Sequence, residues 1–139
     1  MLWYTSAGDA TQVQDALPAA TGFYMCCGKI KVTGNGSVHS VGISELSTIV
    51  QAAGRLPVQH TIAVDANVTW DGAALISATD AIADLVVSSN ASGAIVDYEV
   101  PADLWKMWGA VKTRAVANGY VRWASVLAKA LHAKGRTLG

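Results

Sequence analysis

The alternation of apolar and polar positions predicts strands through most of the first hundred residues. Residues 2–6 and 94–100 have the apolar character of strands. Within the extended stretch 22–34, Ile30 and Val32 alternate with polar neighbours, and Gly28 is a candidate β-bulge. The pair Asn35-Gly36 follows, a favoured two-residue turn, so we expect an antiparallel hairpin closed by residues 37–41.

A second hairpin is expected around Asp71-Gly72. This turn pair lies between residues 66–70 and 73–77, which read as its two strands. Before it, residues 58–64 alternate as a single strand, and His60 falls on the apolar face of that strand. A lone histidine in such a position is more often a core residue than a catalyst or a ligand.

Two short helices interrupt these strands. Residues 44–53 carry apolar side chains at helical spacing, with Ser44 placed to cap the start and Gly54 to cap the end. A second helix is expected from Ser77 to about residue 89, where Asp80 would complete a capping box with that serine. The predicted fold class is therefore α+β: an antiparallel, hairpin-rich body with two short helices, followed by a C-terminal pair of amphipathic helices.

The C-terminal pair occupies residues 101–139. Leu104, Met107, Trp108, Val111 and Ala115 form one apolar stripe at helical spacing, and Tyr120, Trp123, Ala124, Leu127 and Leu131 form another. A single unbroken helix would bring Arg122 onto the first stripe, so Asn118-Gly119 is interpreted as the break between two helices. The chain is expected to be one domain, residues 1–139, because its length suits a single core.

Charge is divided between the body and the tail. Residues 1–100 hold nine of the ten acidic residues and three of the ten basic ones, giving −6, whereas residues 101–139 give +6. The chain is also poor in charge, at 14%, and 52% hydrophobic. Complementary charge and apolar surface predict contact between the tail and an acidic protein surface, either the chain's own body or a neighbouring copy.

The leading hypothesis is thus a non-enzymatic structural or assembly protein, a self-associating subunit such as a virion, tail or shell component. Its partner would be itself or another protein of a larger assembly. The interface candidates are one aromatic and five basic side chains of the tail: Trp105, Lys106, Lys112, Arg114, Arg122 and Lys129. One alternative is a small nucleic-acid-binding module that uses the basic helices.

Candidate chemistry adds little to this hypothesis. Cys26 and Cys27 are adjacent, so they would point to opposite faces of a strand and are poorly placed to bridge or share a metal. A second alternative, a cysteine-dependent enzyme, would pair one of them with His39 across the hairpin. No catalytic, cofactor-binding or metal-binding residue is assigned, and no cofactor is expected.

The chain contains no apolar run long enough to span a bilayer. Its first residues lack the basic and apolar regions of a secretion signal. The expected location is therefore the cytoplasm or an assembled particle.

Overall fold

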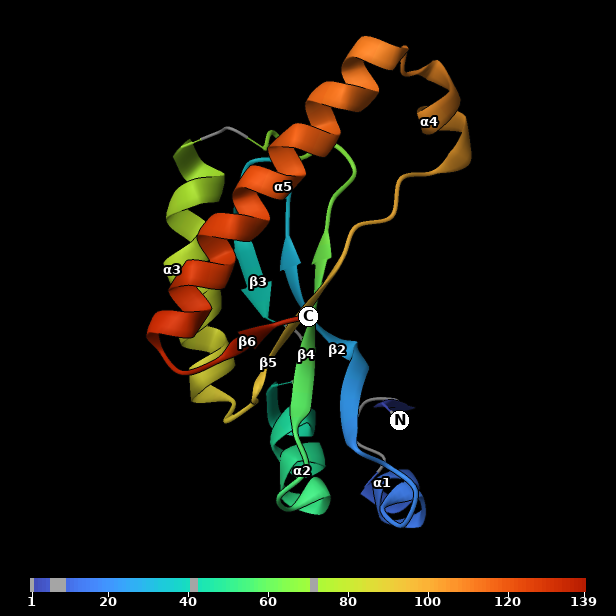
Figure 1. Ribbon diagram of the computed structural model, residues 1–139, viewed down its shortest axis with the longest axis vertical. Helices are drawn as coiled ribbons and strands as arrows, with labels where there is room; N and C mark the ends of the chain where they lie inside the picture. The colour runs from blue at the N-terminus through green and yellow to red at the C-terminus, as the bar shows by residue number, and fades with distance from the viewer. Residues whose placement is uncertain (1, 6–9, 41–42, 71–72) are drawn as a thin grey trace.

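The computed structural model describes the backbone of residues 2–5, 10–40, 43–70 and 73–139, and their side chains except at 2–5, 25–31, 39–40, 43–46 and 74. The order of the helices and strands is β1 (Leu2–Thr5), α1 (Ala10–Ala16), β2 (Gly22–Val32), β3 (Val38–Ser40), α2 (Ile43–Ala53), β4 (Val58–Val64), α3 (Ala73–Ser88), β5 (Gly93–Asp97), α4 (Ala102–Met107), α5 (Ala110–Ala133) and β6 (Thr137–Leu138). Helices and strands alternate along the chain except that β3 follows β2 and α5 follows α4 (Figure 1).

The sheet is mainly parallel, so the predicted antiparallel, hairpin-rich body is wrong. Strands β1, β2, β4, β5 and β6 lie in that order and each pairs in parallel with the next. A parallel pair needs a crossover connection, and here the helices between the strands provide it. The fold is therefore α/β, built from successive strand–helix units.

The strand order never reverses, which determines where the helices lie. Apart from β3, each new strand adds to the same side of the sheet, and right-handed crossovers then place the connecting helices on the same side of the sheet. Burial agrees with this arrangement, since Val58, His60, Ile62 and Val64 of β4 are buried in the core. On the other face of the strand, Gln59 and Ala63 are half-buried, and Thr61 between them is buried. A sheet wound in one direction with one face free is the arrangement found in α/β barrels.

The first predicted hairpin is confirmed. Strand β3 pairs antiparallel with the end of β2, and Val32 lies opposite Val38. The turn is closed by the Gly36 N–H, which donates to the Thr33 carbonyl at 2.9 Å, and Gly36 has a φ of 81° that favours glycine. The register of β2 against β4 also shifts between Met25 and Lys29, which brackets the bulge expected at Gly28.

The second predicted hairpin is wrong. Asp71-Gly72 lies outside the described residues, but the expected return strand at 73–77 is the first part of α3. Helix α3 therefore begins at Ala73, four residues before the Ser77 start that the capping pattern predicted. The other local predictions fare better: α2, β4 and β5 fall within one to three residues of the expected ranges.

The tail forms two helices, but the break is not at Asn118-Gly119. The chain turns at Trp108 and Gly109, and α5 then runs unbroken from Ala110 to Ala133. The first predicted stripe does not form, because Met107 is 80% exposed and Val111 is 85% exposed. The second is confirmed at its centre, where Trp123, Leu127 and Leu131 are buried.

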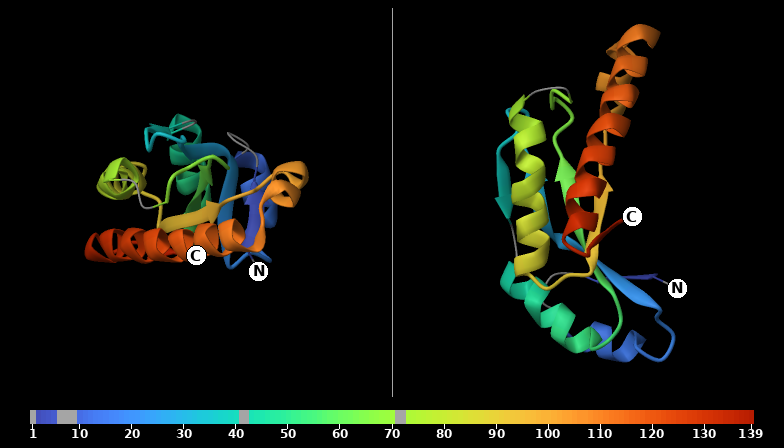
Figure 2. Two further views of the ribbon diagram at one scale, coloured as in Figure 1. Left: turned by 90° about the horizontal axis from the view of Figure 1, so that it is seen from above. Right: turned by 60° about the vertical axis from the view of Figure 1, so that its left-hand side comes forward.

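Helix α5 packs beside α3, but only along its C-terminal part (Figures 1 and 2). Its first nine residues contain no buried side chain, and together with α4 they extend beyond the ends of the strands. We call this extension, residues 102–118, the arm. Its position is fixed by what α5 contacts where the arm meets the body.

At that point Trp70, in the connection from β4 to α3, packs against the backbone of α5. A Cβ atom on Gly119 would collide with the Cβ and Cγ atoms of Trp70. Trp70 also meets Tyr98, Tyr120 and Trp123, with ring centroids 4.8, 5.4 and 5.4 Å away. Each such pair contributes about 0.5–1.5 kcal/mol beyond the area it buries. Gly119 is thus a packing residue rather than a helix terminator.

We expect Gly119→Ala to destabilise the protein by about 1–3 kcal/mol, because the methyl group overpacks a site where backbone and indole already touch. The measurement is chemical denaturation followed by tryptophan fluorescence. Gly109→Ala is the matched control, since a Cβ there meets nothing within 4 Å. Equal stability of the two variants would contradict the proposed packing role.

Buried His60 predicts a pH dependence of stability. Burial lowers the pKa of His60 from 6.5 to about 4, with the backbone of Thr61 opposing the effect. The unfolded chain therefore binds one proton more than the folded chain between pH 6.5 and 4. The free energy of unfolding should be highest above pH 6.5 and fall on the order of 2–3 kcal/mol as the pH approaches 4. In His60→Leu this part of the loss should disappear from urea denaturation series; an unchanged pH slope would contradict the assignment.

Candidate functional site

The carboxyl ends of β4 and β5 lie side by side and carry acidic residues. Ala63 of β4 is the register partner of Asp97, the last residue of β5. Asp65 and Glu99 each follow two residues further along their own segments. Three carboxylates therefore gather at the carboxyl edge of a parallel sheet, which is where α/β proteins place their functional groups.

Strand alternation directs two of these carboxylates to the open face. Tyr98 points to the helix side, because its ring packs against Trp70 and lies stacked 6.2 Å from Tyr120. Its neighbours Asp97 and Glu99 therefore point to the opposite face, which no described helix covers. Asp97 is half-buried and Glu99 is exposed. Residues two apart on an extended chain lie roughly 6–7 Å apart, so both carboxylates can act on one bound group.

The third carboxylate, Asp65, belongs to the loop that follows β4. Its carboxylate accepts a hydrogen bond from the Asn67 N–H at 2.8 Å, which holds the loop in a tight turn. The Tyr98 hydroxyl donates to the Ala66 carbonyl at 3.3 Å. Burial raises the pKa of Tyr98, the nearby Asp65 charge raises it further and Trp70 opposes both. Tyr98 thereby ties the end of β5 to the loop after β4.

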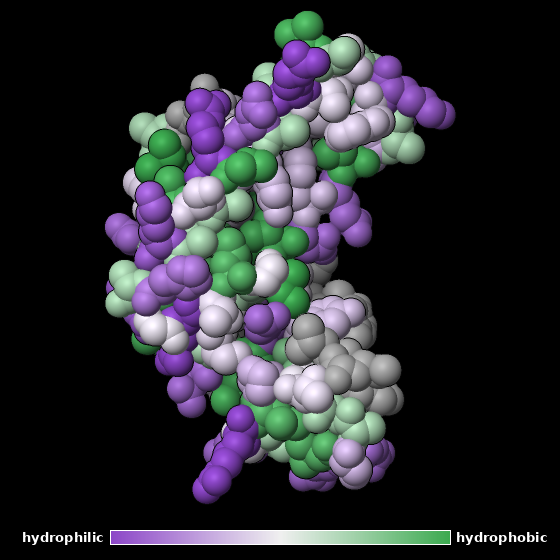
Figure 3. Space-filling view, in the orientation of Figure 1, coloured by the Kyte–Doolittle hydropathy of each residue, from purple (hydrophilic) through white to green (hydrophobic). Residues whose placement is uncertain are grey.

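The open face of the sheet is partly polar. Tyr24, Gln59 and Ile95 are half-buried there, and the Gln59 amide donates to the Thr137 hydroxyl at 3.5 Å. The molecule is visibly hollowed below the arm, where apolar and polar side chains meet (Figure 3). Half-buried side chains therefore surround the buried Thr61 on this face, beside the carboxylates.

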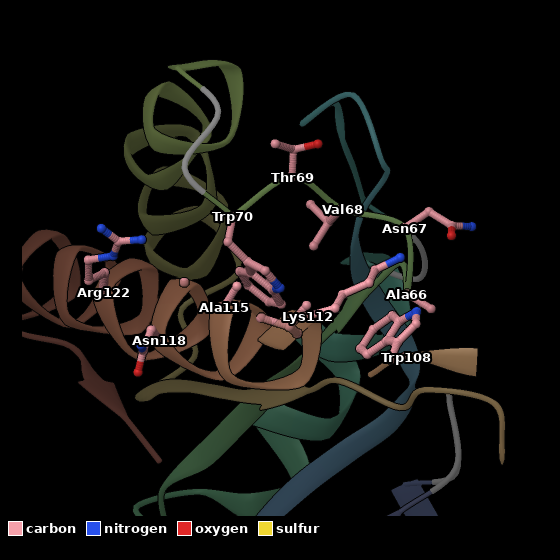
Figure 4. A pocket seen from close by; sticks show the side chains of 12 residues that line it. Ala66, Asn67, Val68, Thr69, Trp70, Trp108, Lys112, Ala115, Asn118 and Arg122 are labelled. Carbon is pink, nitrogen blue, oxygen red and sulfur yellow. The ribbon is translucent and has the colours of Figure 1, made fainter. Parts of the chain in front are cut away.

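A groove of about 570 Å³ lies between the loop after β4 and the N-terminal half of α5 (Figure 4). The lining residues are Ala66, Asn67, Val68, Thr69, Trp70, Trp108, Lys112, Ala115, Val116, Asn118, Gly119 and Arg122. The Lys112 ammonium lies 5.0 Å from the centre of the Trp108 ring. We call this feature the basic groove, because both of its charged side chains are cations.

A second pocket, of about 390 Å³, lies between α5 and the segment that leaves β5. Its aromatic lining comes from Tyr98, Trp105 and Tyr120. Trp105 is 50% exposed and lies 5.8 Å from the Trp108 ring, so the two tryptophans link this pocket to the basic groove.

The six predicted interface residues all lie on α4 and α5, but they do not form one patch. Lys112 and Arg122 line the basic groove, whereas Arg114 lines a separate pocket of about 290 Å³. Trp105 and Lys106 are on α4, and Lys129 is exposed further along α5. Whether any of them contacts another protein remains a prediction.

The sequence interpretation missed Asp97 and Glu99. Their signal is an Asp-x-Glu alternation at the end of an apolar strand, followed by a proline that stops the strand. That alternation looks the same on an ordinary solvent-facing strand, and only the parallel neighbour β4 makes it the carboxyl edge of a sheet. The side chains of Cys26, Cys27 and His39 lie outside those that the structure describes.

No protein-family model matches the chain, and no curated protein sequence is similar enough to match. Solved structures do match, at low identity. The chain is similar to the spore cortex-lytic enzyme SleL of Bacillus megaterium, with a TM-score of 0.69 and 13% identity. It is also similar to a chitinase of Chromobacterium violaceum (0.63, 21%) and to the GH18 chitinase ChiB of Flavobacterium johnsoniae (0.57, 16%). Each comparison covers 99% of this chain but only 33%, 43% and 44% of the other chain.

These comparisons overturn the functional hypothesis drawn from the sequence. The matching structures are a spore cortex-lytic enzyme and two chitinases, so the expectation of a non-enzymatic virion or shell subunit is wrong. The nucleic-acid and cysteine-enzyme alternatives have no counterpart among these structures. The charge asymmetry on which the hypothesis relied is real, but part of it lies in the basic groove.

Two further findings bound the site. In the part of the chain that the structure describes, no helix has the length and apolar character needed to cross a membrane. Within the same residues, no three His, Cys, Asp or Glu side chains lie close enough together to hold a metal ion.

Proposed function

We propose that the chain provides the catalytic edge of a glycoside hydrolase, with Glu99 and Asp97 as its reacting carboxylates. The observation that supports this most is the placement of both side chains on the open face at the carboxyl end of β5. Glycoside hydrolysis commonly uses a pair of acidic residues beside the scissile bond. The hydrolase fold of the matching structures fits the same chemistry.

The two carboxylates have different surroundings and therefore different roles. Glu99 is exposed and can reach the glycosidic oxygen of a bound sugar, where its proton would go to the leaving group. Asp97 is half-buried, two residues earlier on the same face. Its negative charge would stabilise the positive charge that develops on the sugar ring as the bond breaks.

The same comparison supports a class of substrate. The matching enzymes are named for chitin and for the spore cortex. We propose a structural polysaccharide of this kind as the substrate. The partly polar open face and the aromatic side chains near the edge suit a sugar chain, which presents hydroxyl groups and apolar ring faces together.

The edges of the sheet suggest a partner chain that would add strands to it. The chain spans less than half the length of the structures that it matches, and the described sheet has β1 at one edge and β6 at the other. An open edge leaves backbone donors and acceptors without partners. We propose that a second copy of the chain pairs with these edges and so extends the sheet around the open face.

We expect Glu99→Gln to lower the rate of chitin-oligosaccharide hydrolysis about a hundredfold or more, because the amide cannot supply the proton. Asp97→Asn should also lower it, through loss of the stabilising charge. The assay is release of reducing sugar, with circular dichroism to verify folding. Asp103→Asn in α4 removes a carboxylate outside the site and should leave the rate unchanged. Hydrolysis by Glu99→Gln at the wild-type rate would refute the assignment.

Pairing at the β6 edge can be tested with a single proline. The Thr137 and Gly139 N–H groups donate to the Ser92 and Ala94 carbonyls, so the Leu138 N–H between them faces outward. Leu138→Pro removes this outward donor and keeps both inward ones. Light scattering should then give a dimer mass for the wild type and a monomer mass for the variant. A wild-type monomer at high concentration would refute the dimer but leave the hydrolase proposal standing.

A further inference from the structure

The basic groove is lined by hydrogen-bond donors that the rest of the fold does not use. Trp108 is 8% exposed, and its indole N–H has no acceptor among the described residues. Figure 4 shows this nitrogen and the Lys112 ammonium at the same end of the groove, near Ala66. A buried donor without an acceptor costs free energy, so its presence favours a ligand that accepts there.

Charge in the groove has one sign. Lys112 and Arg122 make no ion pair with any described residue, and none of the residues that line the groove is acidic. Lys112 also lies in the first turn of α5, where the unpaired N–H groups of the helix carry partial positive charge. The groove therefore attracts negative charge and provides nothing that would neutralise a bound cation.

The groove is long enough for an extended ligand. Lys112 and Arg122 are ten residues apart on one helix, about 15 Å along its axis. Figure 4 shows them at opposite ends of the groove, with Trp70 between them. A single small anion could contact only one of the two cations, whereas a chain with negative groups spaced along it could contact both.

We propose that the basic groove binds an acidic glycan chain, through oxyanions attached to its sugars. The groove shares the loop after β4 with the proposed catalytic edge, because Ala66 lines the groove and accepts the hydrogen bond of Tyr98. A glycan held by Lys112 and Arg122 would thus contact the loop after β4 on the helix side of the sheet, whereas Glu99 points to the open face. This inference rests on the proposed hydrolase function, and it makes the preferred substrate a charged polysaccharide rather than a neutral one.

The test compares three probes on one backbone: neutral, carboxymethylated and phosphorylated chitin oligosaccharides. Binding is measured by calorimetry in the full chain carrying Glu99→Gln, so that no probe is cleaved. We expect the two anionic probes to bind at least about tenfold more tightly than the neutral one, as charge-assisted hydrogen bonds would give. The tighter of the two identifies carboxylate or phosphate as the natural group.

Two sets of variants locate the effect. Lys112→Gln with Arg122→Gln should remove the preference for anionic probes, and Trp108→Phe should weaken it by removing the N–H while keeping an aromatic ring. The matched control, Lys106→Gln with Lys129→Gln, removes the same charge from outside the groove. An equal loss in the control would mean diffuse attraction to the basic helices and would overturn the proposal.

The remaining outcomes separate this inference from the proposed function. Equal affinity for neutral and anionic probes, or no binding of any probe, overturns the groove assignment. Tighter binding of single-stranded DNA than of either anionic glycan does so as well. Hydrolysis is followed in parallel with the groove variants in the wild-type background. If the groove variants still hydrolyse the neutral oligosaccharide, the catalytic role of the sheet edge is supported even where the binding assignment of the groove is refuted. Groove-dependent binding without any hydrolysis would refute the enzyme and leave the glycan site.

Discussion

The contact between Trp70 and the backbone of α5 at Gly119 determines the arrangement of the whole upper part of the molecule. Trp70 belongs to the loop after β4, and the helix can approach it closely only because residue 119 has no side chain. Tyr98, Tyr120 and Trp123 pack around the indole. This cluster holds the helix against the loop, so it positions the wall of the basic groove and the last residues of β5 together.

Local patterns predicted the elements but not how they pair. Residues 58–64 alternate as a strand does, and residues 44–53 have helical spacing with a glycine at the end, so β4 and α2 could be recognised from a few neighbouring residues. Parallel pairing leaves no such local signal, because the partners of β4 are distant in the chain. Gln59 of β4 pairs with Tyr24 and Thr61 pairs with Ile95, in each case some thirty residues away. The hairpin at Asn35-Gly36 was predictable because its turn and both strands are adjacent.

The sequence does not reveal the roles of several glycines and carboxylates, because one residue type can occupy a turn, a helix end, a close contact or a functional site. The pair Asp71-Gly72 is typical of a hairpin turn, although a helix follows it. Gly119 is typical of a helix end, whereas here it makes room for the indole of Trp70. Asp97 and Glu99 were counted only as negative charge. Their role in the candidate site depends on a strand that is distant in sequence, so the chemistry could not be assigned before the sheet was known.

The pairing of β5 with β6 stops short of the carboxylates. Among the described residues, β6 is opposite Gly93 and Ala94 of β5, and this pairing does not extend to Asp97. Any strand that pairs there would have its register set by main-chain hydrogen bonds, in steps of roughly 6.6 Å for each pair of residues. The distance from a side chain of the added strand to Asp97 would therefore be set by the register of the strand rather than by side-chain packing.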